Sequence, residues 1–131
     1  MPNDSSFFKV EAVSASRISY LNDAALQEFV LNNTFLVVDV REPDEYQKEH
    51  ISGARNVPAS SFSDNQFSVL EDDSKILLHC KSGRRTKLPE NVEKFLRLAQ
   101  GKAVFCMEGG IEQWKRCGFE VLIENTPVFV A

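Results

Sequence analysis

The segment Ile76-Leu77-Leu78-His79-Cys80-Lys81-Ser82-Gly83-Arg84-Arg85-Thr86 joins a short apolar run to a basic loop that contains a glycine. Two further apolar runs lie at residues 35–38 and 103–107, and both are rich in branched or aromatic side chains. Short, uninterrupted runs of this kind are typical of strands buried on both faces of a mainly parallel sheet. The three runs therefore predict three buried strands.

Helical patterns lie between and after these runs. Residues 22–32 offer Asn22 as an N-cap and repeat apolar side chains along one face. Residues 90–99 show the same helical spacing, and a third pattern at 110–117 stops at Gly118. Strands that alternate with helices predict an α/β fold with right-handed crossovers.

Shorter elements are expected around this frame. Pro43 and the acidic residues after it indicate a short helix, and residues 54–57 indicate a small strand. Residues 59–75 are polar and are expected to hold at most one or two helical turns. The apolar tail at 121–131 suits an edge strand or a surface docking segment.

The length of 131 residues predicts one domain over residues 1–131, and the balance of 43% hydrophobic and 26% charged residues is typical of globular proteins. The net charge of -4 argues against nonspecific nucleic-acid binding as the main function. No apolar run approaches the ~20 residues that cross a bilayer, and residues 1–6 carry no signal-peptide pattern. We therefore expect a soluble, cytoplasmic domain that binds neither nucleic acid nor membrane.

The chain has three cysteines, Cys80, Cys106 and Cys117. Their odd number and wide spacing argue against a disulfide framework, and free thiols fit a reducing compartment. The two histidines, His50 and His79, complete no zinc-ligand pattern with them. We expect no metal.

In an open parallel sheet, ligands bind beyond the carboxyl ends of the strands. Three segments are predicted to meet there: residues 39–41, 80–86 and 108–110. The middle segment carries the most chemistry, because it places a cysteine at the end of a buried strand and just before a glycine-containing turn.

This arrangement predicts stabilisation of the Cys80 thiolate and of an oxyanion beside it. Helix N-terminal amides and nearby cations stabilise a thiolate, and Gly83 allows successive N–H groups to converge on an anion. The alternative is a buried structural cysteine followed by a solvated turn, which the basic surroundings disfavour. The basic residues in this segment are Lys81, Arg84, Arg85 and Lys87, with no acidic residue among them.

The sequence resembles the rhodanese-like sulfurtransferases. Four blocks carry the resemblance, in family order and spacing, at residues 36–46, 50–58, 80–86 and 108–118. Together they cover about residues 35–119. The resemblance implies about five mainly parallel strands flanked by helices on both faces, with Cys80 as the catalytic residue.

The resemblance also implies a reaction. A Cys80 thiolate would attack the sulfane sulfur of thiosulfate or a similar donor, expel sulfite and become a persulfide, which cyanide or a thiol, including a protein thiol, would then discharge. Residues Lys81, Ser82, Gly83, Arg84 and Arg85 would form the anion-binding loop. This chemistry needs no cofactor.

Two other functions are weighed against this one. A binding or regulatory module would retain the fold without turnover, but the intact cysteine and basic loop favour an enzyme. The related phosphatases and arsenate reductases carry arginine six positions after cysteine, where this chain has Thr86. The shorter loop, which ends at Arg85, suits a sulfur atom better than a phosphate.

Four further residues have open or secondary roles. Pro89 interrupts the helix expected after the loop, so that either a helix near Arg84 kinks at Pro89 or the main helix begins near Leu88. Arg41 is a candidate for the pocket rim, and Asp39 is expected to hold the neighbouring loop. His79 should point away from the Cys80 side chain, because neighbouring residues of a strand face opposite sides.

Overall fold

The computed structural model describes residues 17–61, 75–99 and 101–123. Its larger sheet contains β1 (Ile18–Leu21), β2 (Phe35–Asp39), β4 (Arg55–Asn56), β5 (Lys75–His79) and β6 (Val104–Met107). The longer helices are α2 (Asp23–Asn32), α4 (Pro89–Ala99) and α5 (Gly110–Arg116). Shorter elements are α3 (Pro43–Lys48), β3 (Glu49–His50), β7 (Leu122–Ile123) and the 3₁₀ turns η1 (Ala59–Ser61) and η2 (Arg85–Lys87).

The five strands form a sheet in the order β1-β6-β5-β2-β4, with every neighbouring pair parallel. Val38 of β2 lies beside Leu78 of β5, which in turn lies beside Cys106 of β6. The predicted five-stranded, mainly parallel α/β sheet is confirmed. The three apolar runs form β2, β5 and β6, which occupy its centre.

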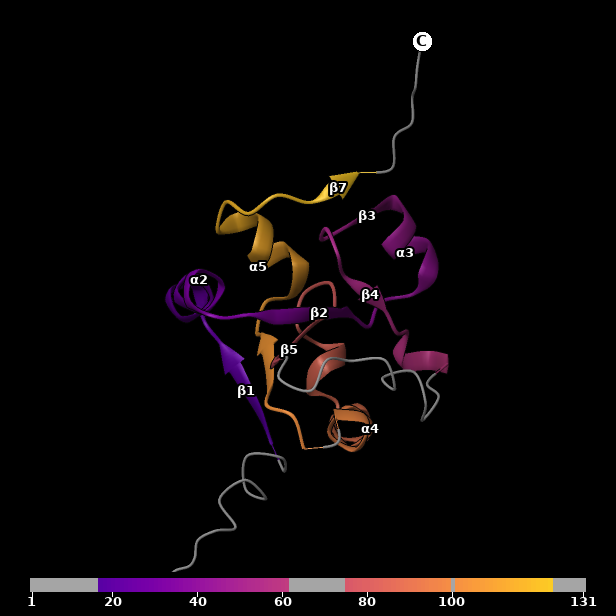
Figure 1. Ribbon diagram of the computed structural model, residues 1–131. Coiled ribbons are helices and arrows are strands. Elements are labelled where there is room, and N and C mark those ends of the chain that lie inside the picture. The colour runs from indigo at the N-terminus through magenta and orange to yellow at the C-terminus, as the bar shows by residue number, and fades with distance from the viewer. Residues whose placement is uncertain (1–16, 62–74, 100, 124–131) are drawn as a thin grey trace, which may run out of the picture.

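Helices cover both faces of the sheet (Figure 1). Leu77 points to the face covered by α2 and α5, where it joins Leu26 and Trp114 in one apolar cluster. Leu78 points to the opposite face and packs in a second cluster with Phe95 of α4. Because each strand is buried on both sides, its sequence is continuously apolar rather than alternating.

Local sequence explains where the helices begin. The Asn22 side chain accepts a hydrogen bond from Ala25 N at 2.9 Å and caps α2. Pro43 occupies the first turn of α3. Pro89 is the first residue of α4, where its missing N–H costs no hydrogen bond, and a separate turn, η2, precedes it. The second of the two predicted arrangements around Pro89 is therefore the one observed.

Two strand pairings were not predicted. β1 forms the sheet edge beside β6, and β7 pairs antiparallel with β3 in a two-residue ribbon. This ribbon confirms a strand in the first part of the tail at 121–131. Residues 124–131 and most of the segment at 59–75 lie outside the described residues.

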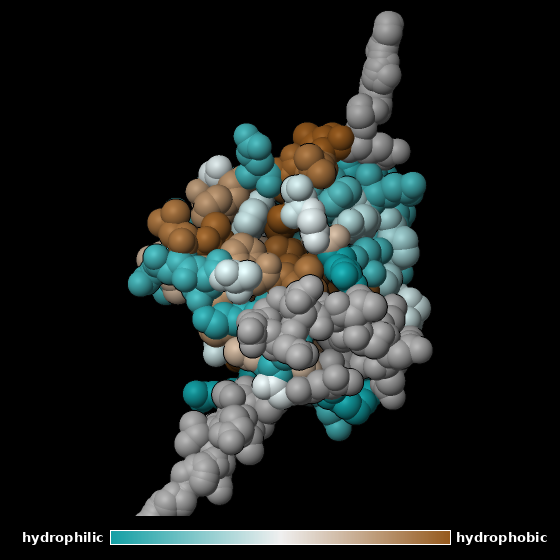
Figure 2. Space-filling view, viewed as in Figure 1, coloured by the Kyte–Doolittle hydropathy of each residue, from teal (hydrophilic) through white to brown (hydrophobic). Residues whose placement is uncertain are grey.

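Hydrophobic side chains are exposed over β7, where Figure 2 shows a brown patch at the top of the molecule. Leu122 and Ile123 are 51% and 70% exposed. In the described part of the chain, no helix combines the length and the apolar character that a membrane crossing requires.

Candidate active site

The three segments predicted to meet at the carboxyl ends of the strands do lie together. Val40 N donates to the carbonyl of His79 at 3.0 Å, which joins the end of β2 to the end of β5. Ile111 N donates to the carbonyl of Cys80 at 2.8 Å, and Glu112 N to that of Lys81 at 3.2 Å. The first turn of α5 therefore holds the start of the Cys80 loop from one side.

The Cys80 thiol is buried, with 1% of the residue exposed. The basic sequence around it had indicated an unburied environment, and that expectation is wrong. Cys80 continues the alternation of β5, so its side chain joins the apolar cluster under α4 while the loop folds over it. Gly83 N donates to Sγ at 3.1 Å, and the Thr86 hydroxyl lies 3.7 Å from Sγ.

The loop has a specific need for glycine at position 83. Gly83 has a φ of 98°, in the left-handed region, and a Cβ there would overlap the carbonyl of Glu108. This conformation turns its N–H toward the Cys80 sulfur, where it stabilises a negative charge. The separate turn η2 lies between the loop and α4. The N–H group that contacts the thiol therefore belongs to the loop and not to the first turn of α4.

A pocket of about 320 Å³ opens over the thiol. The Lys81 and Arg84 side chains are exposed and have no ion-pair partner among the described residues. The exposed Leu88 adds an apolar wall. The lining residues are Cys80, Lys81, Ser82, Arg84, Arg85 and Leu88, which includes every predicted loop residue except Gly83.

Arg85 differs from the other loop cations because Glu45 binds it. Its two terminal nitrogens donate to the two carboxylate oxygens of Glu45 at 2.9 and 3.1 Å. The hydrogen bond from Arg85 lowers the pKa of Glu45 to about 2. Arg85 therefore anchors the loop to α3, and the Glu45 carboxylate pairs with its charge.

Arg41 does not line the pocket over Cys80 itself, but lines a neighbouring pocket together with Lys81. It is 3% exposed and pairs with Asp39 at 2.8 Å. Its guanidinium also donates to the carbonyl of Glu49 at 2.7 Å. Asp39 holds the loop as expected, since it accepts from Arg41 N at 3.0 Å.

His79 lies within this buried polar group. Its Nδ1 is 2.9 Å from the carbonyl of Cys80, and its Nε2 is 3.6 Å from a carboxylate oxygen of Asp39. Burial lowers the pKa of His79. Because its ring contacts backbone and carboxylate rather than the thiol, it is not placed to act as a base for Cys80.

Sequence reasoning missed the support behind the loop. Thr86 is buried and donates to the carbonyl of Gly83 at 3.2 Å, while its own carbonyl accepts from the Tyr20 hydroxyl at 2.8 Å. Tyr20 belongs to β1, a strand without a clear sequence signal.

Burial raises the pKa of Cys106 to about 12, so this thiol stays protonated and is a poor nucleophile.

No group of three or more histidine, cysteine or acidic side chains in the described part of the chain is arranged to hold a metal ion. The chemistry available at the site is that of the thiol, the amide of Gly83 and the cations of Lys81 and Arg84.

Comparison with known proteins gives a consistent similarity. A family model described as a rhodanese-like domain matches residues 22–117. The chain is 32% identical over 106 residues to the uncharacterised protein slr1261 of Synechocystis, covering 80% of this chain and 57% of that protein. It is 30% identical over 103 residues to the putative sulfur carrier protein YrkF of Bacillus subtilis, covering 77% and 53%. The chain thus spans little more than half the length of these two curated relatives.

Solved structures show the same similarity. The rhodanese-related protein of Thermoplasma volcanium matches with 30% identity and a TM-score of 0.60, over 81% of this chain and 99% of that one. The rhodanese-like domain of Alr3790 from Anabaena matches with 25% identity and a TM-score of 0.65, over 86% of each chain.

Proposed function

The chain belongs to the family of rhodanese-like domains, and from this premise we propose that it is a sulfurtransferase that carries sulfane sulfur as a persulfide on Cys80. One observation carries the proposal: Gly83 N donates to the Cys80 sulfur at 3.1 Å at the floor of a cation-lined pocket. An amide at this position stabilises a thiolate before the reaction and the bound sulfur after it.

The first half-reaction takes sulfur from an anionic donor of the thiosulfate type. The Cys80 thiolate attacks the outer sulfur of the donor, a new S–S bond forms, and the bond to the central sulfur breaks. Sulfite leaves with the electron pair. Lys81 and Arg84 at the pocket wall attract the sulfonate oxygens of the donor and its leaving group.

The second half-reaction returns Cys80 to its thiolate form. An acceptor such as cyanide or a thiolate attacks the outer sulfur of the persulfide, and the Cys80 S–S bond breaks. Because sulfite leaves before the acceptor reacts with the persulfide, the proposal requires ping-pong kinetics. The thiosulfate-type donor and the cyanide or thiol acceptor are both part of this proposal.

The site supports sulfur transfer better than phosphate or arsenate chemistry. The position six residues after Cys80 is Thr86, which is buried and carries no charge. The nearest loop arginine before it, Arg85, already has both terminal nitrogens on Glu45. A tetrahedral oxyanion at Cys80 would therefore lack an arginine six positions after the cysteine, as the related phosphatases and arsenate reductases carry.

A second candidate function is a binding module without turnover. The observation that favours it is the burial of the thiol, which leaves 1% of Cys80 exposed. One of the relatives, from Mycobacterium tuberculosis, is named an HTH-type transcriptional regulator and is 33% identical over 94 residues. The two candidates differ in whether Cys80 gains sulfur.

The test is intact mass spectrometry after incubation with thiosulfate. We expect a gain of one sulfur atom on the wild-type protein, removal of that sulfur by cyanide, and no gain on Cys80→Ser. Cys117→Ser is the matched control, because Cys117 is the most exposed of the three cysteines and should leave sulfur loading intact. A folded, reduced protein that gains no sulfur from thiosulfate or other sulfane donors would contradict the enzyme and favour the module.

A further inference from the structure

The outer edge of β2 is only partly covered by β4. β4 pairs with Val38 and Asp39, whereas β5 pairs with every residue of β2 on the inner side. The chain before β4 turns away from β2, because Ala54 N donates to the carbonyl of Ile51 at 3.0 Å. In the described part of the chain, no strand lies beside residues 35–37 on this edge.

Two backbone groups face this open edge. Backbone groups alternate between the two edges of a strand in a parallel ladder. Val40 N donates to the carbonyl of His79 at 3.0 Å, on the side of β5, and the carbonyl of Asp39 accepts from Val57 N at 2.9 Å on the other side. The same alternation directs the N–H of residue 37 and the carbonyl of residue 35 to the open edge, where a further strand would bind both.

A pocket of about 340 Å³ opens along this edge. The side chains of Phe35 and Val37 pack on the face covered by α2 and α5, whereas that of Leu36 packs on the face covered by α4. A pocket that all three residues line runs along the edge of the strand and not over one face. Its other lining residues are Ile51, Ser52, Gly53, Trp114 and Glu120.

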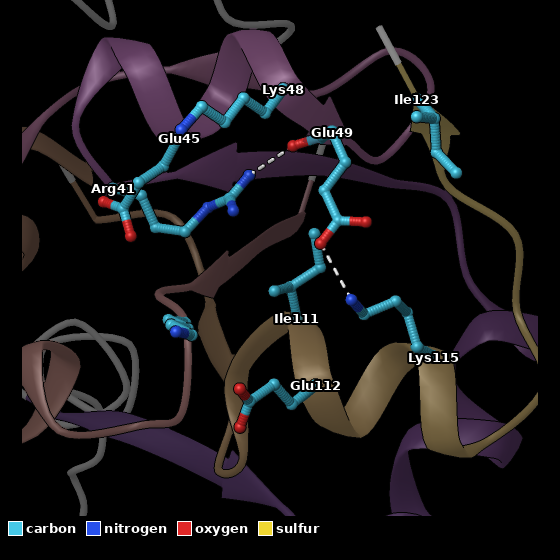
Figure 3. A pocket seen from close by; sticks show the side chains of 9 residues that line it. Arg41, Glu45, Lys48, Glu49, Ile111, Glu112, Lys115 and Ile123 are labelled. Carbon is cyan, nitrogen blue, oxygen red and sulfur yellow. Dashed lines mark hydrogen bonds and ion pairs between the residues drawn. The ribbon is translucent and has the colours of Figure 1, made fainter.

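The edge pocket is separate from the proposed sulfur-transfer site. It shares no lining residue with the pocket over Cys80. It also shares none with the neighbouring pocket between α3 and α5, which Figure 3 shows. A molecule bound in the edge pocket therefore leaves the opening above the thiol free.

The lining residues define the chemistry that the edge pocket binds. Ile51 and Trp114 supply apolar surface from the face under α5, and the indole N–H of Trp114 already donates to the carbonyl of Glu120 at 2.8 Å. Among the described residues that line the pocket, Glu120 alone is charged, and its exposed carboxylate forms no ion pair within them. The pocket therefore favours an apolar side chain with a cation nearby.

We propose that this edge binds an extended peptide segment of a partner protein, which adds a short strand beside residues 35–37. The peptide backbone binds the N–H of Val37 and the carbonyl of Phe35. One apolar side chain enters the pocket, and a lysine or arginine two positions away binds Glu120. This spacing follows because alternate residues of a strand point to the same face, and Trp114 and Glu120 lie on the side of α5. The interaction goes beyond sulfur transfer, since none of these residues contacts Cys80.

The test selects binders from a random-peptide library displayed on phage, with the full-length protein as the target. We expect the enriched peptides to share an apolar residue and a lysine or arginine at positions i and i+2. A synthetic peptide of the enriched sequence should slow hydrogen exchange of the Val37 amide, measured by NMR, because a peptide carbonyl binds that N–H. A peptide that binds and leaves this exchange unchanged would contradict the added strand.

Three variants locate the binding. Ser52→Trp places an indole beside the pocket from an exposed turn and should weaken peptide binding about tenfold or more. Glu120→Lys reverses the charge and should weaken binding of the basic peptides roughly threefold to tenfold. Glu93→Lys makes the same change at an exposed position of α4, on the other face of the sheet, and is the matched control. None of the three should alter the response of Cys80 to thiosulfate.

The outcomes decide between occupants of the edge. Peptides that show the expected spacing, protect Val37, and lose affinity in Ser52→Trp and Glu120→Lys but not in Glu93→Lys support the proposal. A selection that enriches no peptide, or peptides that bind Ser52→Trp as tightly as the wild type, overturns it. A wild-type dimer in light scattering that becomes a monomer in Ser52→Trp also overturns it, because a second copy of this chain would then occupy the edge.

Discussion

At the scale of single residues, the Thr86 hydroxyl braces the loop over the thiol. It donates to the carbonyl of Gly83 at 3.2 Å and lies 3.7 Å from the Cys80 sulfur. Thr86→Val keeps the shape but leaves a buried carbonyl without its donor, so we expect a loss of about 1 to 3 kcal/mol in the free energy of unfolding. We also expect slower sulfur uptake, because the amide of Gly83 is held less firmly.

Urea denaturation and the rate of mass gain with thiosulfate measure these two effects. Thr86→Ser retains the hydroxyl and is the control for the lost donor. If the valine variant were as stable and as fast as the serine variant, the hydroxyl would have no bracing role.

The residue that we propose as the reactive one was predictable from the sequence, but its partners were not. Cys80 and its basic loop follow one another along the chain, so local spacing located them. Arg85 and Glu45 lie 40 positions apart in the sequence, and no sequence pattern indicates that they pair. Arg41 was expected at the pocket rim because it follows the end of a central strand, whereas here it is buried and pairs with the carboxylate of Asp39.

At the scale of elements, the Cys80 loop and the turn before α5 fit against each other through glycine. A Cβ on Gly83 would overlap the carbonyl of Glu108, and its φ of 98° disfavours any other residue. We expect Gly83→Ala to abolish sulfur loading and to lower stability by more than the ~1 to 2 kcal/mol that a left-handed residue costs.

Gly53→Ala provides the matched comparison. Gly53 has a similar φ of 81°, but nothing lies within 4 Å of the position of an added Cβ. Its variant should lose only the conformational ~1 to 2 kcal/mol and should still load sulfur. Equal behaviour of the two variants in thermal unfolding and mass gain would mean that contact with Glu108 does not matter.

The start of α4 gives a second test at this scale. Pro89 is its first residue, so Pro89→Ala restores no interior hydrogen bond and should change the free energy of unfolding by less than about 1 kcal/mol. Glu93→Pro, at an exposed interior position of the same helix, should cost about 3 kcal/mol or more. If Pro89→Ala were much more stable than the wild type in urea denaturation, Pro89 would instead kink a helix that begins before it.

The elements differ in how far the sequence determines them. Runs that are apolar throughout mark β2, β5 and β6, because strands buried on both faces need such residues. β1 lies at the sheet edge with exposed residues among its four, and β3 and β7 have two residues each. Their pairing depends on partners far away in the sequence, which a local pattern does not contain.

At the scale of the whole molecule, a buried polar group lies where the central strands β2 and β5 end. Asp39 and Arg41 pair there, and His79 stands 3.6 Å from the Asp39 carboxylate. Arg85 is the other charge that acts on His79. His79 Nε2 has no hydrogen-bond partner in the described part of the chain. Its titration is therefore tied to folding as a whole.

We predict that His79 makes stability depend on pH just below neutrality. Burial lowers its pKa in the folded protein, so the unfolded chain binds the proton more readily as the pH falls below about 6.5. The free energy of unfolding should be highest above that pH and should fall below it, by at most about 1.4 kcal/mol per pH unit. The carboxylates with lowered pKa, Asp23 and Glu45, reduce the free energy of unfolding chiefly as the pH falls below their ordinary pKa values of 3.8 and 4.5.

Urea denaturation between pH 7.5 and pH 5 measures this slope, and variants assign it. His79→Gln removes the titrating ring and should flatten the dependence, whatever its absolute stability, because the slope reports proton uptake and not packing. His50→Gln, which changes a half-buried ring stacked on Tyr46 at 4.0 Å, should leave the slope in place. A slope that survives in His79→Gln but disappears in His50→Gln would place the pH sensitivity in the α3–β3 connection and not in the centre of the sheet.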